Sequence, residues 1–190
     1  MIRTRTTVAG STAFLALGIA INLAGCAIEP TEVESERLDS NTGTTVTLMP
    51  KPVELIVEKP RGTKTDPFAY VAPFETNRMG SHELYLWVSA PQAAGALSVP
   101  QLYCGNNLVP LDKFEGTPKE MGLSNAPYKT PAPWSAQWYF KVSGEVLDCL
   151  ATAPRIRITT QAADATEPDS YVAEGQAASA VNVFLSRVRT

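Results

Sequence analysis

The cysteines are the residues of this sequence whose positions point most directly to chemistry. Cys26 follows two small residues at the end of an apolar run, residues 13–21, and two arginines precede that run. A positive start, a short apolar core and small residues at its end are the three parts of a secretory signal peptide. A membrane-spanning helix needs about 20 apolar residues, so this shorter core predicts a cleaved signal over residues 1–25.

The end of this signal contains the quartet Leu23, Ala24, Gly25 and Cys26. It resembles the lipobox of bacterial lipoproteins, in which cleavage falls before the cysteine. The resemblance implies a diacylglyceryl group on the Cys26 sulfur and a third acyl chain, such as palmitate, on its nitrogen. Each buried methylene adds about 0.8 kcal/mol, so three chains would anchor the protein to the membrane. The alternative is an ordinary secretory signal, although such signals favour an A-x-A pattern.

The residue after the cysteine bears on location. In Gram-negative lipoproteins, an aspartate directly after the lipidated cysteine is a signal for retention in the inner membrane. This sequence, which resembles those lipoproteins, has Ala27 at that position. The resemblance therefore implies the outer membrane, with the body facing the periplasm or the cell surface.

Once Cys26 is assigned to lipid, Cys104 and Cys149 remain as a pair. In an oxidising compartment two such cysteines predict a structural disulfide. A redox pair or a metal site is the other interpretation. No C-x-x-C spacing is present, and a single histidine in the chain provides little for a zinc shell. We therefore predict no metal and no cofactor.

Removal of the signal leaves 190 − 25 = 165 residues, which suits one domain. The whole chain has 16 basic and 19 acidic residues, and the loss of two arginines with the signal gives 14 − 19 = −5. This charge argues against nucleic acid as a partner. Residues 26–43 carry several carboxylates and few large apolar side chains, which predicts a flexible tether or, alternatively, a docking peptide.

Aromatic residues provide the most distinctive surface chemistry. Trp134 and Trp138 lie in the stretch PAPWSAQWYF, and Tyr128 precedes it. These rings either fill the core or bind a ligand. Trp134 stands in a proline-rich approach, so we take Trp134 and Tyr128 as the candidate binding residues. Exposed aromatic rings anchor protein partners or stack on sugars.

No catalytic constellation emerges. The sequence lacks G-x-S-x-G, P-loop, G-x-G-x-x-G and H-E-x-x-H patterns. The single histidine, His82, lies beside Ser81 and Glu83, but adjacent residues of a strand point to opposite faces. Asp164, Glu167 and Asp169 lack the spacing of an EF-hand calcium loop and are typical of a solvated loop. We therefore expect no enzyme.

The elements that hold these residues are predicted to be short strands. Alternating or apolar runs occur at 44–48, 53–57, 68–74, 83–90, 136–143, 145–151, 155–160 and 180–188, and a hairpin turns at 105–107. Residues 114–135 contain four prolines and predict a long loop. A short helix is expected between residues 171 and 180. Strands spaced by turns, with little helix, predict one all-β domain over residues 44–190, an antiparallel β-sandwich of seven to nine strands.

Taken together, these features predict a non-catalytic lipoprotein anchored in the outer membrane through Cys26. Its expected role is structural, or the binding of another protein of the cell envelope or of a secretion assembly. The alternative is a module that binds a glycan or a small molecule. Both interpretations rest on location and fold class, which many unrelated functions share.

Overall fold

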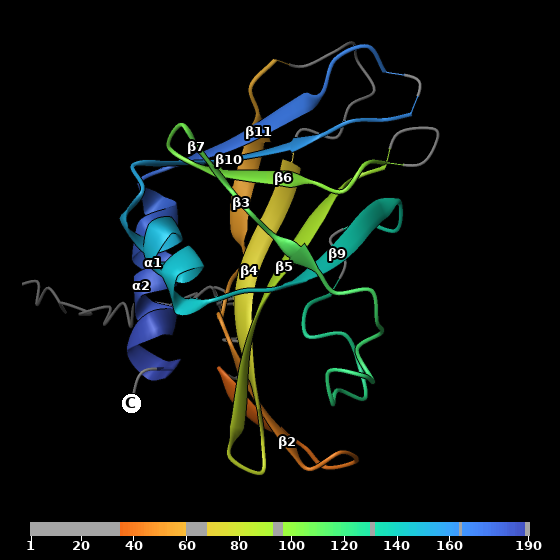
Figure 1. Cartoon of the computed structure of the whole chain (residues 1–190), viewed down its shortest axis with the longest axis vertical. Coiled ribbons are helices and arrows are strands. Elements are labelled where there is room, and N and C mark those ends of the chain that lie inside the picture. The colour runs from red at the N-terminus through yellow and green to blue at the C-terminus, as the bar shows by residue number, and fades with distance from the viewer. Residues whose placement is uncertain (1–34, 60–67, 93–96, 130–131, 164, 189–190) are drawn as a thin grey trace, which may run out of the picture. The chain divides into compact units, whose positions relative to one another are not determined.

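A computed structural model describes residues 35–59, 68–92, 97–129, 132–163 and 165–188 (Figure 1). The chain divides into two units, Met1–Thr31 and Glu32–Thr190, and all described residues belong to the second. The predicted signal, Cys26 and the first part of the tether lie outside the described residues. Neither described helix is long and apolar enough to cross a bilayer.

The body contains eleven strands and two helices among the described residues. The strands are β1 Glu36–Asp39, β2 Thr44–Leu48, β3 Val53–Val57, β4 Phe68–Arg78, β5 Ser81–Pro91, β6 Gln101–Cys104, β7 Asn107–Val109, β8 Asp112–Lys113, β9 Ser135–Lys141, β10 Arg155–Thr160 and β11 Asp169–Glu174. The helices are α1 Gly144–Thr152 and α2 Gln176–Val188.

The predicted all-β class is confirmed. All eleven strands belong to one sheet with the order β7-β6-β10-β11-β3-β4-β5-β9-β8, while β2 pairs with β4 and β1 with β2. All pairs of neighbouring strands among the described residues are antiparallel, and the sheet curls into a half-barrel (Figure 1). Strand β4 is central, because one of its edges pairs with β5 and the other with both β2 and β3.

Two predicted strands, 145–151 and 180–188, are helices instead. The strand prediction placed Val181, Val183 and Leu185 on one side, but Val183 is 48% exposed and Phe184 is fully buried. Val181, Phe184 and Leu185 have the spacing of a helix face. In α1, Leu147, Leu150 and Ala151 are buried with the same spacing. These short apolar runs fit both the two-residue period of a strand and the 3.6-residue period of a helix. Packing against the sheet favours the helix.

The expected short helix over 171–180 is also wrong in its first half. Tyr171 and Ala173 are buried in alternation, and β11 pairs with β10 along its whole length. The body also begins earlier than predicted. Residues 36–39 of the expected tether form β1, and the Asp39 carboxylate accepts hydrogen bonds from the backbone N–H and the hydroxyl of Ser124, at 2.6 and 2.7 Å.

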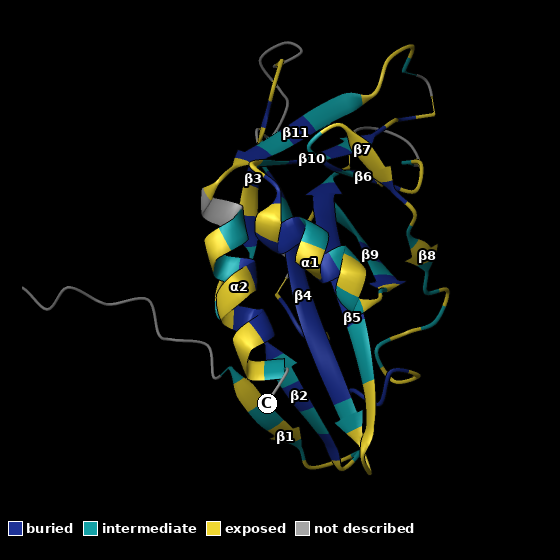
Figure 2. Cartoon of the chain, turned by 60° about the vertical axis from the view of Figure 1, so that its left-hand side comes forward, coloured by how far each residue is buried: buried dark blue, intermediate teal, exposed yellow. Residues whose placement is uncertain are grey.

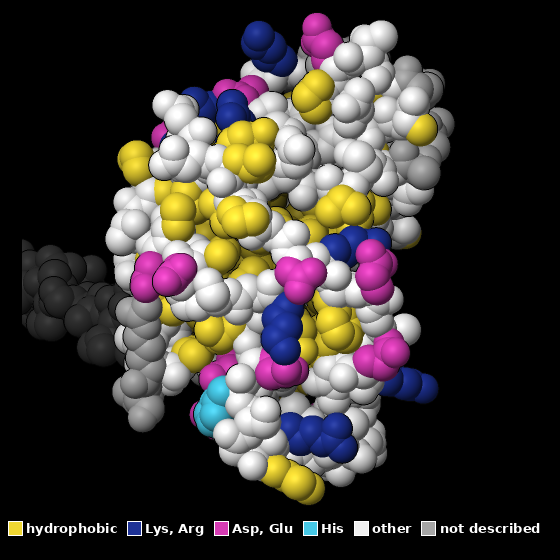
Figure 3. Space-filling view, in the orientation of Figure 1, with side chains coloured by type: hydrophobic (Ala, Val, Ile, Leu, Met, Phe, Trp, Pro, Cys, Tyr) yellow, Lys and Arg dark blue, Asp and Glu magenta, His cyan; other side chains and the backbone are white. Residues whose placement is uncertain are grey.

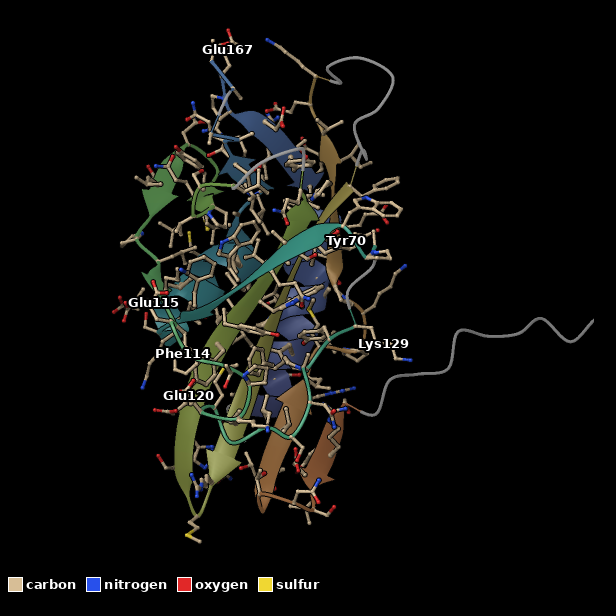
Figure 4. All side chains as sticks on the ribbon, turned by 90° about the vertical axis from the view of Figure 1, so that its right-hand side faces the viewer. Tyr70, Phe114, Glu115, Glu120, Lys129 and Glu167 are labelled. Carbon is tan, nitrogen blue, oxygen red and sulfur yellow. The ribbon has the colours of Figure 1, made fainter. Side chains whose placement is uncertain are left out.

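The two faces of the central strands have different covers. Helices α1 and α2 pack against each other and lie over one face (Figure 2). The predicted long loop between β8 and β9 crosses the other face, where Phe114, Glu120 and Lys129 lie in front of the strands (Figure 4). Aromatic contacts hold this loop on the sheet. The centroid of the Tyr128 ring lies 5.1 Å from that of Trp87 and 6.3 Å from that of Phe74.

Candidate functional site

The aromatic contacts of the loop between β8 and β9 are with the central strands β4 and β5. On the same face of the sheet, beyond these contacts, a row of cross-strand neighbours runs across the strands. Each member is directly opposite the next in the strand register. The cross-strand row consists of Leu108, Tyr103, Arg157, Val172, Ile56 and Phe68, which lie on β7, β6, β10, β11, β3 and β4. Because successive side chains alternate between faces, Phe68 points to the same face as Phe74, which contacts the loop.

The row is open to solvent. Leu108 is 55% exposed and Ile56 is 53% exposed, and the other four members are half-buried. Space filling shows hydrophobic side chains at the surface in the region of β6 and β7 (Figure 3). Their neighbours along the same strands, such as Leu55, Leu102 and Ile158, are fully buried on the opposite face. The loop-side face thus remains apolar beyond the area that the loop contacts.

Tyr103 and Arg157 are the second and third members of this row and are in contact with each other. The guanidinium carbon of Arg157 lies 4.2 Å from the centroid of the Tyr103 ring, which is a cation–π arrangement. The Nε atom of Arg157 is buried and has no hydrogen-bond partner in the described structure. The guanidinium therefore stacks on the Tyr103 ring, and its positive charge also helps to lower the pKa of the Glu58 carboxyl.

Charged groups flank the row. Glu58 accepts hydrogen bonds from Arg155 and from the Ser170 hydroxyl. The Ser170 hydrogen bond, with the positive charge of Arg155, holds the pKa of the Glu58 carboxyl below its usual value. Nε of Arg155 also lies 3.6 Å from Oε1 of Glu174. This network links Glu58, directly after β3, with β11 and β10 and places polar groups beside the apolar residues of the row.

Two hollows open at the row. One, of about 310 Å³, is lined by polar groups that include Glu58, Arg157, Thr159 and Ser170. The other, of about 550 Å³, opens where β3 and β11 separate beyond Ile56 and Val172, and Ala180 of α2 also lines it. Three members of the row therefore line a hollow, namely Arg157, Ile56 and Val172.

The structure separates the two aromatic residues that the sequence offered as binding residues. Trp134 is 59% exposed, and its carbonyl accepts a hydrogen bond from the backbone N–H of Gln92 at 3.0 Å. Tyr128 is only 6% exposed, and its hydroxyl donates to the Pro73 carbonyl and accepts from the Met49 N–H. Tyr128 thus holds the loop on the sheet, and Trp134 alone is accessible from solvent.

Trp134 directly precedes β9, whose first residue, Ser135, pairs with Pro91 at the end of β5. The pairing of β4 with β5 ends earlier, at Tyr70 and Ser89. The strand register therefore does not join Trp134 to the row.

Cys104, which is buried, and Cys149, which is half-buried, are neighbours in the structure. Burial raises the pKa of the Cys104 thiol, and the adjacent Cys149 raises it further. Cys104 lies on β6 and Cys149 on α1, so a bond between them would tie the helix to the sheet. The predicted disulfide stays a prediction.

Other titratable groups contribute little to a candidate catalytic site. Nδ1 of His82 lies 2.8 Å from Oε1 of the buried Glu75, at the exposed start of β5. Among the described residues, no three His, Cys, Asp or Glu side chains gather as metal ligands would. Asp164 lies outside the described residues.

Comparison with known proteins adds no family to this description. No protein-family model, curated protein or solved structure matches the chain.

The row could not be predicted from the sequence, because its members come from six separate strands. One signal was present: Leu55, Ile56 and Val57 are consecutive apolar residues. In a strand, such a run makes both faces apolar, so one of these residues had to lie on the side away from the helices.

Proposed function

We propose that this protein is a lipid-anchored, non-catalytic envelope lipoprotein whose body binds another protein. The lipobox-like quartet ending at Cys26 supports the anchor and an outer-membrane location. The cross-strand row supports protein binding, and it is the observation that carries this part of the proposal. The partner would be another component of the cell envelope or of a secretion assembly.

The composition of the row suits a protein partner. The centres of protein interfaces are enriched in aromatic residues and arginine and depleted of lysine and carboxylates. The row contains the adjacent pair Tyr103 and Arg157, with Leu108 on one side of the pair and Val172 and Ile56 on the other. The residues that dominate binding energy are most often Trp, Tyr and Arg. The charged network of Glu58 and Arg155 would form the polar rim.

Photo-crosslinking in intact cells tests this proposal. A photoreactive amino acid replaces Leu108, and either Ile56→Asp or Val183→Asp is introduced beside it. Ile56 and Val183 are matched, since they are 53% and 48% exposed and both are β-branched. Val183 lies on α2, which covers the face of the sheet opposite the row (Figure 2).

We expect one discrete crosslinked protein, which is lost with Ile56→Asp and retained with Val183→Asp. Both variants should melt within a few degrees of the parent, because neither side chain is buried. Equal crosslinking in the two variants would remove the row as the binding surface. The absence of any adduct would count against a protein partner.

The anchor has a separate test. Mass spectrometry of the mature N-terminus should find Cys26 carrying acyl chains, and Cys26→Ser should release the protein from the membrane fraction. A bare Cys26 sulfur in the wild-type protein would contradict the anchor.

A glycan-binding module is the second candidate function, and the smaller hollow favours it. The groups around it include the carboxylate of Glu58, the guanidinium of Arg157 and the hydroxyls of Thr159 and Ser170. Together they offer the donors and acceptors that sugar hydroxyls pair with. Titration with peptidoglycan fragments or oligosaccharides, followed by calorimetry and tryptophan fluorescence, tests this candidate. No heat and an unchanged spectrum would remove it.

A further inference from the structure

The turn between β4 and β5 carries an apolar side chain that the fold does not use. The last pair of the hairpin is Arg78 and Ser81, so Met79 and Gly80 form a two-residue turn. Their φ angles are 53° and 83°, and two positive φ values define a type I′ turn. Met79 is 99% exposed.

The backbone at Met79 is in an unfavourable conformation. Within the described residues it is the only non-glycine residue with a positive φ. Type I′ turns favour Asn, Asp or Gly at this position, because a longer L side chain is strained there. The methionine gains no burial in return, so the stability of the body does not explain its presence.

The surroundings of Met79 form one end of the body. Thr45 is opposite Asn77, so the β1–β2 turn, residues 40–43, ends at about the same level as the β4–β5 turn (Figure 1). Across residues 40–43 and 77–81, Arg78 is the only Lys, Arg, Asp or Glu. The neighbouring carboxylate of Asp39 accepts two hydrogen bonds from Ser124. This end therefore combines an apolar point with the positive charge of Arg78, and the Asp39 carboxylate lies at its edge.

The predicted anchor lies within reach of this end. Glu36 is opposite Thr47, and Thr47 is opposite Glu75, so Met79 lies four residues beyond the level of Glu36. Four strand residues span about 13 Å. The nine residues from 27 to 35 span at most about 30 Å when extended. A bilayer that holds the acyl chains of Cys26 can thus meet the turn.

We propose that the Met79 turn is a second contact with the lipid bilayer, which fixes the orientation of the body at the membrane. The thioether side chain of Met79 enters the boundary between headgroups and acyl chains, and the Arg78 guanidinium binds an anionic lipid phosphate. This inference rests on the proposed lipid anchor. Its partner is the lipid surface, and a protein pocket for Met79 is the alternative that the test can reveal.

Fluorescence quenching in vesicles tests the contact. The full mature lipoprotein, purified from membranes, is reconstituted into phosphatidylethanolamine–phosphatidylglycerol vesicles, with and without bromine on the acyl chains. Met79→Trp is compared with Leu108→Trp, and the signal of the wild-type tryptophans is subtracted. Leu108 is a matched control, since it is 55% exposed and lies on the β6–β7 hairpin, away from the β4–β5 turn (Figure 1).

We expect bromine to quench the tryptophan of Met79→Trp, with a blue shift of its emission, and to leave that of Leu108→Trp unchanged. Equal quenching of the two variants in protein that floats with the vesicles would overturn the contact and leave the anchor intact. Protein that does not float would instead overturn the anchor, and with it this inference. The Met79 thioether could instead be shielded from an added oxidant in intact cells while Met79→Trp is not quenched in vesicles. That result would indicate a protein pocket for Met79 and would also overturn the lipid contact.

Discussion

The role of Tyr128 leads to the sharpest test of the structure. Its hydroxyl donates to the Pro73 carbonyl at 2.6 Å and accepts from the Met49 N–H at 3.0 Å, and both bonds are buried. Burial raises the pKa of this phenol far above its ordinary value, so the hydroxyl keeps its proton. Tyr128→Phe removes the oxygen and leaves a donor and an acceptor unpaired inside the core.

The cost follows from these two groups. A buried polar group that loses its partner costs about 1–3 kcal/mol, so the two together cost about 2–6 kcal/mol. For a domain of this size, each kcal/mol lowers the melting temperature by about 2–4 °C. We expect a fall of at least about 4 °C, and up to about 24 °C, in a thermal melt, with a matching loss in urea denaturation.

Tyr103→Phe is the matched control. The Tyr103 hydroxyl donates to the side chain of Gln101 in an exposed hydrogen bond, so its loss should change the free energy of unfolding by less than about 0.5 kcal/mol. If Tyr128→Phe is no more destabilising than Tyr103→Phe, the loop is not held by this hydroxyl. The interpretation of Tyr128 as a ligand-binding residue would then return.

Three further predictions concern other parts of the body. In oxidising buffer Cys104 and Cys149 should form a disulfide that closes 149 − 104 = 45 residues, worth about 4 kcal/mol in the chain-entropy model, and urea melts with and without reductant measure it. Hydrogen bonds from Ser124, first from its hydroxyl and then from its N–H, lower the pKa of Asp39 from its ordinary 3.8. The stability advantage of the wild type over Asp39→Asn should therefore be complete above about pH 5 and shrink as pH falls through 3.8, as urea melts over a pH series can check. Met79→Asn should raise the free energy of unfolding by about 0.5–1 kcal/mol, because asparagine suits the type I′ turn; a loss of stability would refute the strain argument.

The strands whose bounds were predicted correctly are those with one buried face. Residues 44–48, 53–57 and 155–160 match β2, β3 and β10, since each alternates buried and more exposed side chains. Local alternation is enough to identify such strands because the core imposes it directly.

Local pattern fails where a run fits two periods. Val181, Val183 and Leu185 satisfy a strand, while Val181, Phe184 and Leu185 satisfy a helix. Only the position of the sheet, against which Phe184 and Leu185 are buried, decides between them. The same information was needed for α1, where the helix spacing of Leu147, Leu150 and Ala151 was present but read as a strand.

The candidate surface depends on strand order, which no single segment encodes. Phe68 and Leu108 stand at opposite ends of the row, and five strand pairings are needed to connect them. Sequence reasoning could identify an exposed tryptophan, because proline excludes regular pairing at Trp134. It could not identify the residues of the row.

The architecture gives a physical reason for a partner at the row. A sheet whose strands carry apolar residues on both faces requires two covers, since each exposed Å² of apolar surface costs about 25 cal/mol. The helices cover one face, and the loop, through Tyr128 and Phe114, covers part of the other. The loop reaches Trp87, Phe74 and Tyr85 on the central strands, while Ile56 and Leu108 on the far strands stay open. A binding partner at the cross-strand row would complete for the outer strands the cover that the loop provides for the central ones.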